Sequence, residues 1–265
     1  MLYYTVDSGW RDRFMSSEEK SGLCEFIDSI NHNENDIQAY LETHTQYLVP
    51  ERHGHGVMHS SIITKFPLGN KYVTDYVYLC KNSAFWTMYL VELEDAKKVL
   101  LRKDGKVTSA FSHAIGQVHD WKYYIESNEG EAHIRDTLKR FLYFNPTFGK
   151  LPIKFKYLLL IGRTSQTNPE REREIRYSYS SENLIILTYD SLMHNAQYNA
   201  SIRDRYIILS MRDGDKYKTK YVPNNVSTSL FAYLTSEELK LEDGHRQTLI
   251  DCGYNITEWE KGNLL

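Results

Sequence analysis

The stretch from residue 72 to residue 94 constrains the fold more than any other, because it is expected to form a β-hairpin. Tyr72–Leu79 alternates and is rich in Tyr and Val, with Asp75 in its middle. Phe85–Leu93 is aromatic and aliphatic, and residues 81–83 supply the turn between the two strands. A chain that contains such a hairpin is expected to be organised on a sheet with a buried face.

Acidic residues stand at positions that this hairpin can bring together. Glu92 and Glu94 are two residues apart, so a strand would point both to the same face, and antiparallel pairing can place Asp75 beside them. Carboxylates in an apolar sheet are costly to keep ionised unless a cation lies among them. The pattern therefore predicts a site for a hard divalent metal. The alternative is a solvent-facing Asp75 and an exposed strand end at Glu94.

Composition sets the broad class of protein. The chain has 265 residues, a net charge of −3 and three scattered cysteines, Cys24, Cys80 and Cys252. The charge argues against a global basic field for a polyanion, and the odd cysteine count favours a reducing compartment. With neither a long apolar run nor a signal-like start, the chain is expected to be cytoplasmic, with no membrane contact.

Periodicity along the chain predicts a mixed α/β fold. Helical patterns cover residues 35–48, 109–125, 131–144 and 169–179, and apolar or alternating runs predict strands at 57–66, 156–162 and 184–188. Together with the hairpin, this order predicts a mixed central sheet flanked by helices. Three parts are expected: a helical lead-in over 1–33, the core domain over 34–195, and a small C-terminal hairpin-plus-helix appendage over 196–265.

Three histidines, His53, His55 and His59, precede the hairpin. Their spacing on a loop and strand start is not a strong zinc signature, so solvated or structural roles are favoured over metal ligation.

The ordered set of elements resembles the PD-(D/E)xK nuclease core and, more narrowly, the Shedu family of bacterial antiphage nucleases. The resemblance rests on QAYLETHTQYL, VTDYVYL, FWTMYLVELE, SAFSHAIGQVHDWKYYIESN, KYLLLIGR and LIILTYDSL, from about residue 36 to residue 194. It implies a metal-dependent DNA endonuclease that acts on phage or foreign DNA with Mg²⁺ or Mn²⁺, and a homo-oligomer.

The resemblance also implies roles for individual residues. Asp75 matches the metal-binding acid, Glu92 the second ligand, and Gln117 the glutamine of the following helix. The usual lysine falls on Glu94, which is a departure, although a carboxylate can still act as a general base and share a metal. Lys97 or Lys98 could replace the missing lysine from a few residues on.

Contacts with DNA are expected from Lys97, Lys98, His113 and Arg163, since local cations suit phosphate groups. Each has an alternative: a solvated face for the lysines, a satisfied core position for His113, and pairing with a nearby acid for Arg163. Because Glu94 replaces the lysine, a second function also stays open, a catalytically degenerate nuclease-fold module that binds nucleic acid or a protein partner. A purely structural scaffold, with the tyrosine-rich tail as an assembly surface, is a third.

Overall fold

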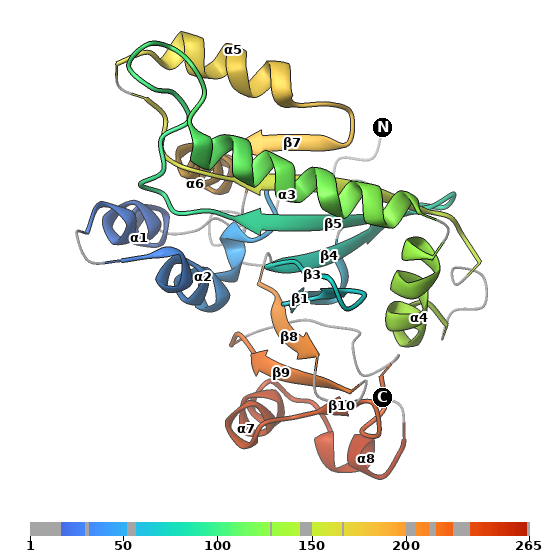
Figure 1. The fold of residues 1–265 in the computed structure, drawn as a ribbon. Helices are drawn as coiled ribbons and strands as arrows, with labels where there is room; N and C mark the ends of the chain where they lie inside the picture. The colour runs from blue at the N-terminus through green and yellow to red at the C-terminus, as the bar shows by residue number, and fades with distance from the viewer. Residues whose placement is uncertain are drawn as a thin grey trace, which may run out of the picture.

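The computed structural model describes residues 17–29, 32–51, 57–127, 129–143, 150–165, 167–199, 205–211, 216–224 and 234–263. An eight-stranded mixed sheet in the order β10-β9-β8-β1-β4-β5-β6-β7 forms its centre (Figure 1). The strands are β1 (Val57–Thr64), β4 (Tyr76–Lys81), β5 (Trp86–Leu93), β6 (Ile153–Leu160), β7 (Leu184–Leu187), β8 (Ile207–Met211), β9 (Tyr217–Tyr221) and β10 (Leu239–Lys240). The predicted α/β class is confirmed.

Helices flank this sheet. They are α1 (Ser17–Asp28), α2 (Glu34–Thr43), α3 (Ser109–Glu126), α4 (Gly130–Tyr143), α5 (Pro169–Tyr179), α6 (Tyr189–Asn199), α7 (Asp243–Asp251) and α8 (Ile256–Glu260). Of these, α2, α3, α5 and α8 each begin after a residue whose side chain caps the helix. Asn33 caps α2 in a capping box, and Thr108 caps α3. In the described part of the chain, no helix is both long and apolar enough to cross a membrane.

Alternation along the strands divides the interior into two cores. Val77 and Leu79 of β4 pack on the side of α3 and α4, whereas Tyr76 and Tyr78 pack with α1, α2 and α6 on the other. Several tyrosines fill this second core, and the rings of Tyr78 and Tyr89 stack at 4.6 Å between centroids. Much of the unusual tyrosine content is therefore core material.

One predicted strand is broken. Tyr72–Leu79 was expected to be continuous, but Tyr72–Val73 (β3) pairs with Pro67–Leu68 (β2) in a separate two-stranded sheet. Asp75 therefore precedes β4 instead of lying inside a strand. The break arises because Thr74 N–H turns to the Phe66 carbonyl, whereas Asp75 N–H donates to the Val91 carbonyl of β5.

The C-terminal segment extends the same sheet. β8 runs parallel to β1, and β9 pairs antiparallel with β8, so the predicted hairpin is present. The helix of the predicted C-terminal appendage begins at Asp243, after Leu239–Lys240, which forms β10 beside β9. Whether the three predicted parts are independent domains stays a prediction, although the sheet runs unbroken from β1 into β8.

Strands β5, β6 and β7 are parallel, so their carboxyl ends meet at one edge of the sheet, where α/β proteins commonly bind ligands. The loops after β5 and β6 touch there at Gly162, whose φ is +66°. A Cβ on Gly162 would lie 2.2 Å from the Lys98 carbonyl oxygen. Glycine is therefore required for this close approach.

We expect Gly162→Ala to lower the free energy of unfolding by about 2–4 kcal/mol, since it adds a backbone clash to left-handed strain. Gly105→Ala is the matched control, because Gly105 has φ +76° and a Cβ added there would meet nothing within 4 Å. It should cost only about 1–2 kcal/mol. Urea denaturation of both variants measures the difference, and equal losses would contradict the close-approach argument.

Candidate active site

The structure brings Asp75 and Glu92 together at the end of the hairpin. The β4–β5 register pairs Tyr76 with Val91, so Asp75 comes opposite Glu92. The Leu93 N–H donates to Asp75 Oδ2 at 2.7 Å. Both acids are buried, with exposed fractions of 8% for Asp75 and 7% for Glu92. The hairpin thus places two carboxylates side by side in a nearly dry environment.

Gln117 joins this pair from the helix above. Its Nε2 donates to Glu92 Oε1 at 2.5 Å. The apolar residues Phe111, Ala114 and Val118 of α3 are buried on the sheet, which fixes the direction of the helix and so of Gln117. His113, one turn earlier, is exposed. Gln117 therefore positions the Glu92 carboxyl group, whereas His113 lies on the surface of α3.

The environment of Glu92 disfavours its charge. Burial, then the charges of Asp75 and Glu34, raise the pKa of Glu92 to about 9, although Lys65 and Lys98 act in the opposite direction. In the metal-free protein at neutral pH the Glu92 carboxyl group is therefore protonated. A dication beside it would favour the ionised form.

Two lysines neutralise the other acids. Lys65 Nζ lies 2.6 Å from Asp75 Oδ1. Lys98 Nζ pairs with Glu94, which follows the end of β5, and lies 3.6 Å from Glu34 Oε2. Of the two lysines considered as replacements for the missing family lysine, Lys98 is the one that reaches these acids.

Lys97 points elsewhere. Its Nζ donates to the His32 carbonyl at 2.7 Å, in the segment that leads into α2. The Lys97 ammonium group is therefore directed toward the main chain at His32.

Sequence reasoning missed Glu34 and Lys65. Glu34 is the first residue of α2, where an acidic side chain is favoured by the helix dipole. Its presence in the sequence therefore gave no separate indication of a place in the site. Burial raises the pKa of Glu34, Lys98 lowers it and Asp75 raises it, which shows that all three are neighbours. Lys65 carries φ +50° at the bend after β1, and no sequence signal marks such a bend.

Arg163, predicted to contact DNA, is engaged by acids, the alternative weighed for it. Its Nε donates to both Asp190 oxygens, at 2.9 and 3.0 Å. Its Nη1 lies 2.6 Å from Asp28 Oδ1 of α1. These bonds raise the pKa of the guanidinium and hold it at the carboxyl end of β6.

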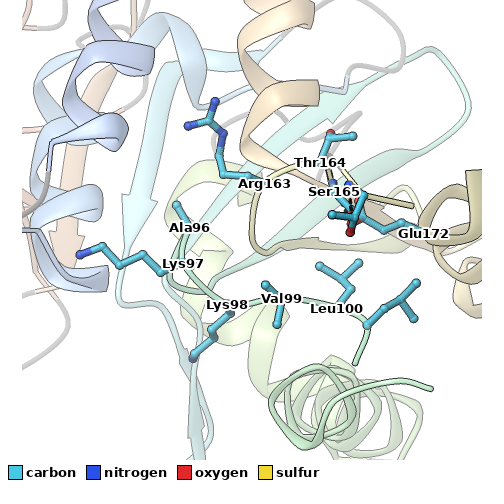
Figure 2. Close-up of a pocket in the computed structure, with 11 residues that line it drawn as sticks. Ala96, Lys97, Lys98, Val99, Leu100, Arg163, Thr164, Ser165 and Glu172 are labelled. Carbon is cyan, nitrogen blue, oxygen red and sulfur yellow. Dashed lines mark hydrogen bonds between the residues drawn. The ribbon is translucent and has the colours of Figure 1, made fainter. Parts of the chain in front are cut away.

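A cavity of about 390 Å³ lies between the loops after β5 and β6, and Lys98, the partner of Glu94, is one of the residues that line it (Figure 2). Val99, Leu100 and Leu101 line part of it, and Ser165 N–H donates to the buried Glu172 carboxylate at 3.0 Å on another wall. Figure 2 shows Lys97 and Arg163 extending away from Leu100, toward the neighbouring helices. The volume of this cavity falls within the range of small-molecule pockets, about 300–1,000 Å³.

The donor chemistry suits a hard dication, but the acids are not arranged as a finished metal site. Within the described residues, no three His, Cys, Asp or Glu side chains converge closely enough to hold a metal. Oxygen donors are available from Asp75, Glu92 and Glu94, yet Lys65 already neutralises Asp75 and Lys98 already neutralises Glu94. His53 and His55, and the side chain of His59, lie outside the described residues.

We expect Glu92→Gln to stabilise the metal-free protein at neutral pH, on the order of 1–3 kcal/mol. The pKa of Glu92 is 4.5 in the unfolded protein and about 9 in the folded protein. Between these pH values unfolding releases a proton, so the free energy of unfolding of the wild-type protein falls as pH rises. The advantage of Glu92→Gln should therefore be absent below pH 4.5 and grow up to about pH 9. Thermal unfolding across this range, in EDTA, measures it.

Glu129→Gln serves as the control, because Glu129 is exposed just before α4. A Glu92→Gln advantage that does not change with pH, or that Glu129→Gln shares, would contradict the assignment of a protonated Glu92.

A family model described as Shedu protein SduA, C-terminal, matches residues 31–193, well over half of the chain. The match begins just before α2 and ends within α6, so it includes every acid and lysine of the candidate site. No curated protein matches the chain at a significant level. The chain therefore belongs to the Shedu SduA family, which is associated with antiphage defence and nuclease activity.

Proposed function

We propose that this protein is a metal-dependent endonuclease that hydrolyses phosphodiester bonds of phage or foreign DNA. The observation that carries the proposal is the pairing of buried Asp75 and Glu92 at the carboxyl end of β5, with Gln117 bound to Glu92. Lys98 and Glu94 form an ion pair next to them. Acids can hold a metal and accept a proton from water, and a lysine can stabilise phosphate charge, so this set of groups can support phosphodiester hydrolysis.

Asp75, Glu92 and Glu94 would hold Mg²⁺ or Mn²⁺ through their oxygens. When bound, such a dication supplies Lewis acidity, which neutralises phosphate charge and acidifies water. Loading would require Lys65 to leave Asp75, and this exchange is accessible because the Lys65 side chain is 52% exposed. Gln117 keeps the Glu92 carboxyl group directed toward Asp75 during the exchange.

Lys98 and Glu94 supply the chemistry that a single lysine provides elsewhere. The Lys98 ammonium can stabilise the negative charge that develops on the phosphate, while the Glu94 carboxylate can accept a proton from the attacking water. Because the two are ion-paired, each holds the other in position. Lys98 would therefore take the role of the usual family lysine, although it lies four residues after Glu94, the position where that lysine is expected.

The second function, a module that binds DNA without cutting it, is favoured by one observation. Lys65 and Lys98 already neutralise Asp75 and Glu94, so the site is electrostatically satisfied without a metal. Metal binding decides between the two functions.

We expect Mn²⁺ to bind wild-type protein in isothermal titration calorimetry and to support cleavage of plasmid DNA. Glu92→Ala should abolish both while the protein stays folded, as far-UV circular dichroism will show. Cleavage retained in Glu92→Ala would remove Glu92 from the mechanism. DNA binding with neither metal uptake nor cleavage would establish the non-catalytic module.

We expect Lys98→Met to reduce the cleavage rate by about a hundredfold, because the charge beside the reacting phosphate is lost. Lys139→Met is the matched control, since Lys139 is exposed on α4 and pairs with Asp136. Single-turnover cleavage rates with Mn²⁺ measure both variants. Equal rates would assign the missing lysine's role to another residue.

A homo-oligomer, implied by the family resemblance, stays a proposal. Light scattering of the full chain tests it directly.

A further inference from the structure

Helix α1 lies outside the family match, yet it packs on the matched domain at the edge where the acids lie. The match begins at residue 31, and α1 ends at Asp28. Leu23 and Ile27 of α1 are buried in the core that includes Leu192 and Ala196 of α6. Figure 1 shows α1 near α2 and the arrowhead of β5, at the carboxyl end of the parallel strands. A segment attached to the family domain thus covers part of its functional edge.

The two acids that pair with Arg163 differ in their exposure to solvent and in their other hydrogen bonds. Asp190 is half-buried, with its side chain 33% exposed, and it also accepts a hydrogen bond from Thr164 N–H at 2.6 Å. The Asp28 side chain is 61% exposed, and its Oδ1 accepts a hydrogen bond from Arg163 Nη1 at 2.6 Å. Its Oδ2 accepts a weaker bond from Cys24 Sγ of the same helix at 3.4 Å. Asp190 therefore fixes the direction of Arg163, whereas Asp28 can be exchanged, since exposed ion pairs are weak.

The space around this ion pair adjoins the candidate active site. A second cavity, also of about 390 Å³, is lined by Ile27, Asp28, Ser29, Ala96, Lys97 and Arg163. Lys97 and Arg163 line the first cavity as well, and the next residue, Lys98, pairs with Glu94. Two cations therefore lie between the two cavities, next to the acids, and chain groups engage both: Asp28 for Arg163 and the His32 carbonyl for Lys97.

We propose that Arg163 and Lys97 form a subsite for a DNA backbone phosphate, and that the Asp28 carboxylate of α1 occupies it in the absence of DNA. A carboxylate oxygen on a guanidinium N–H occupies the place of a phosphate oxygen, because arginine binds both groups through the same planar donors. Asp190 keeps Arg163 pre-oriented when Asp28 leaves. The Asp28 carboxylate is thus an autoinhibitory group, carried by α1, that the DNA phosphate must displace from Arg163. This inference rests on DNA being the substrate of the proposed function.

Asp28→Ala tests the inference. We expect it to tighten binding of a short fluorescent DNA duplex, measured by anisotropy in EDTA, by about two- to tenfold at low salt. The cause is removal of the group that competes with phosphate for Arg163. Glu25→Ala removes the same charge from an exposed position on the same helix and should bind DNA as wild type does. Equal affinities of Asp28→Ala and Glu25→Ala would overturn the proposal.

A second variant shows whether the gain passes through Arg163. In an Asp28→Ala background, Arg163→Gln should return the affinity to the wild-type value or below. Thermal unfolding confirms that the double variant is folded. A gain that persists without Arg163 would overturn the subsite, because the effect of Asp28 would then be a general loss of negative charge.

Binding in EDTA separates this inference from the nuclease proposal. If wild-type protein never cuts DNA but Asp28→Ala binds it more tightly through Arg163, the subsite holds and the nuclease proposal fails. If wild-type protein cuts DNA with Mn²⁺ and Asp28→Ala changes neither affinity nor rate, the nuclease holds and the autoinhibitory contact is wrong. Failure of every variant to bind DNA would overturn the subsite.

Discussion

The hydrogen bond from Leu93 N–H to Asp75 Oδ2 is the contact on which the site depends. In this bond a buried carboxylate accepts from a buried backbone N–H. Either group without a partner would lower the stability of the folded protein. The same contact accompanies the interruption of the strand before β4 and holds Asp75 opposite Glu92. A single polar pairing therefore links the local geometry of the hairpin to the chemistry at its end.

Charge balance around this contact explains how the acids coexist without a metal. Glu92 is protonated at neutral pH, Asp75 is paired with Lys65, and Glu94 is paired with Lys98, which also lies near Glu34. Each lysine is itself partly exposed, so exchange of a lysine for a dication does not require the core to open. The site is thus stable in the absence of metal and remains chemically suited to receive one.

The parallel arrangement of β5, β6 and β7 extends this edge beyond the acids. It brings Arg163, after β6, beside Lys97 and Lys98, after β5, and Gly162 permits the two loops to touch. Helix α1 reaches the same edge from outside the family domain through Asp28. The proposed recognition of a DNA strand and the proposed control of access to it would therefore involve the same few side chains, because all of them lie where the parallel strands end.

Much of the fold followed from sequence, since alternation and helical periodicity are local properties: the α3 face, the central β5 and β6 strands and the C-terminal hairpin were all predictable. The predicted hairpin also placed Asp75 near Glu92, and the resemblance to the Shedu family indicated Gln117. Long-range packing decided the rest. The ion pairs of Lys98 with Glu34 and of Arg163 with Asp28 join segments that are distant in sequence. The pair of Lys98 with Glu94 depends on the bend of the loop after β5. Sequence by itself determined the fold class and the acids proposed for the site, because residue type and strand period are local properties of the chain. Only the tertiary structure decided that Lys65 pairs with Asp75 and that Asp28 pairs with Arg163, because those contacts form when packing brings separate elements together.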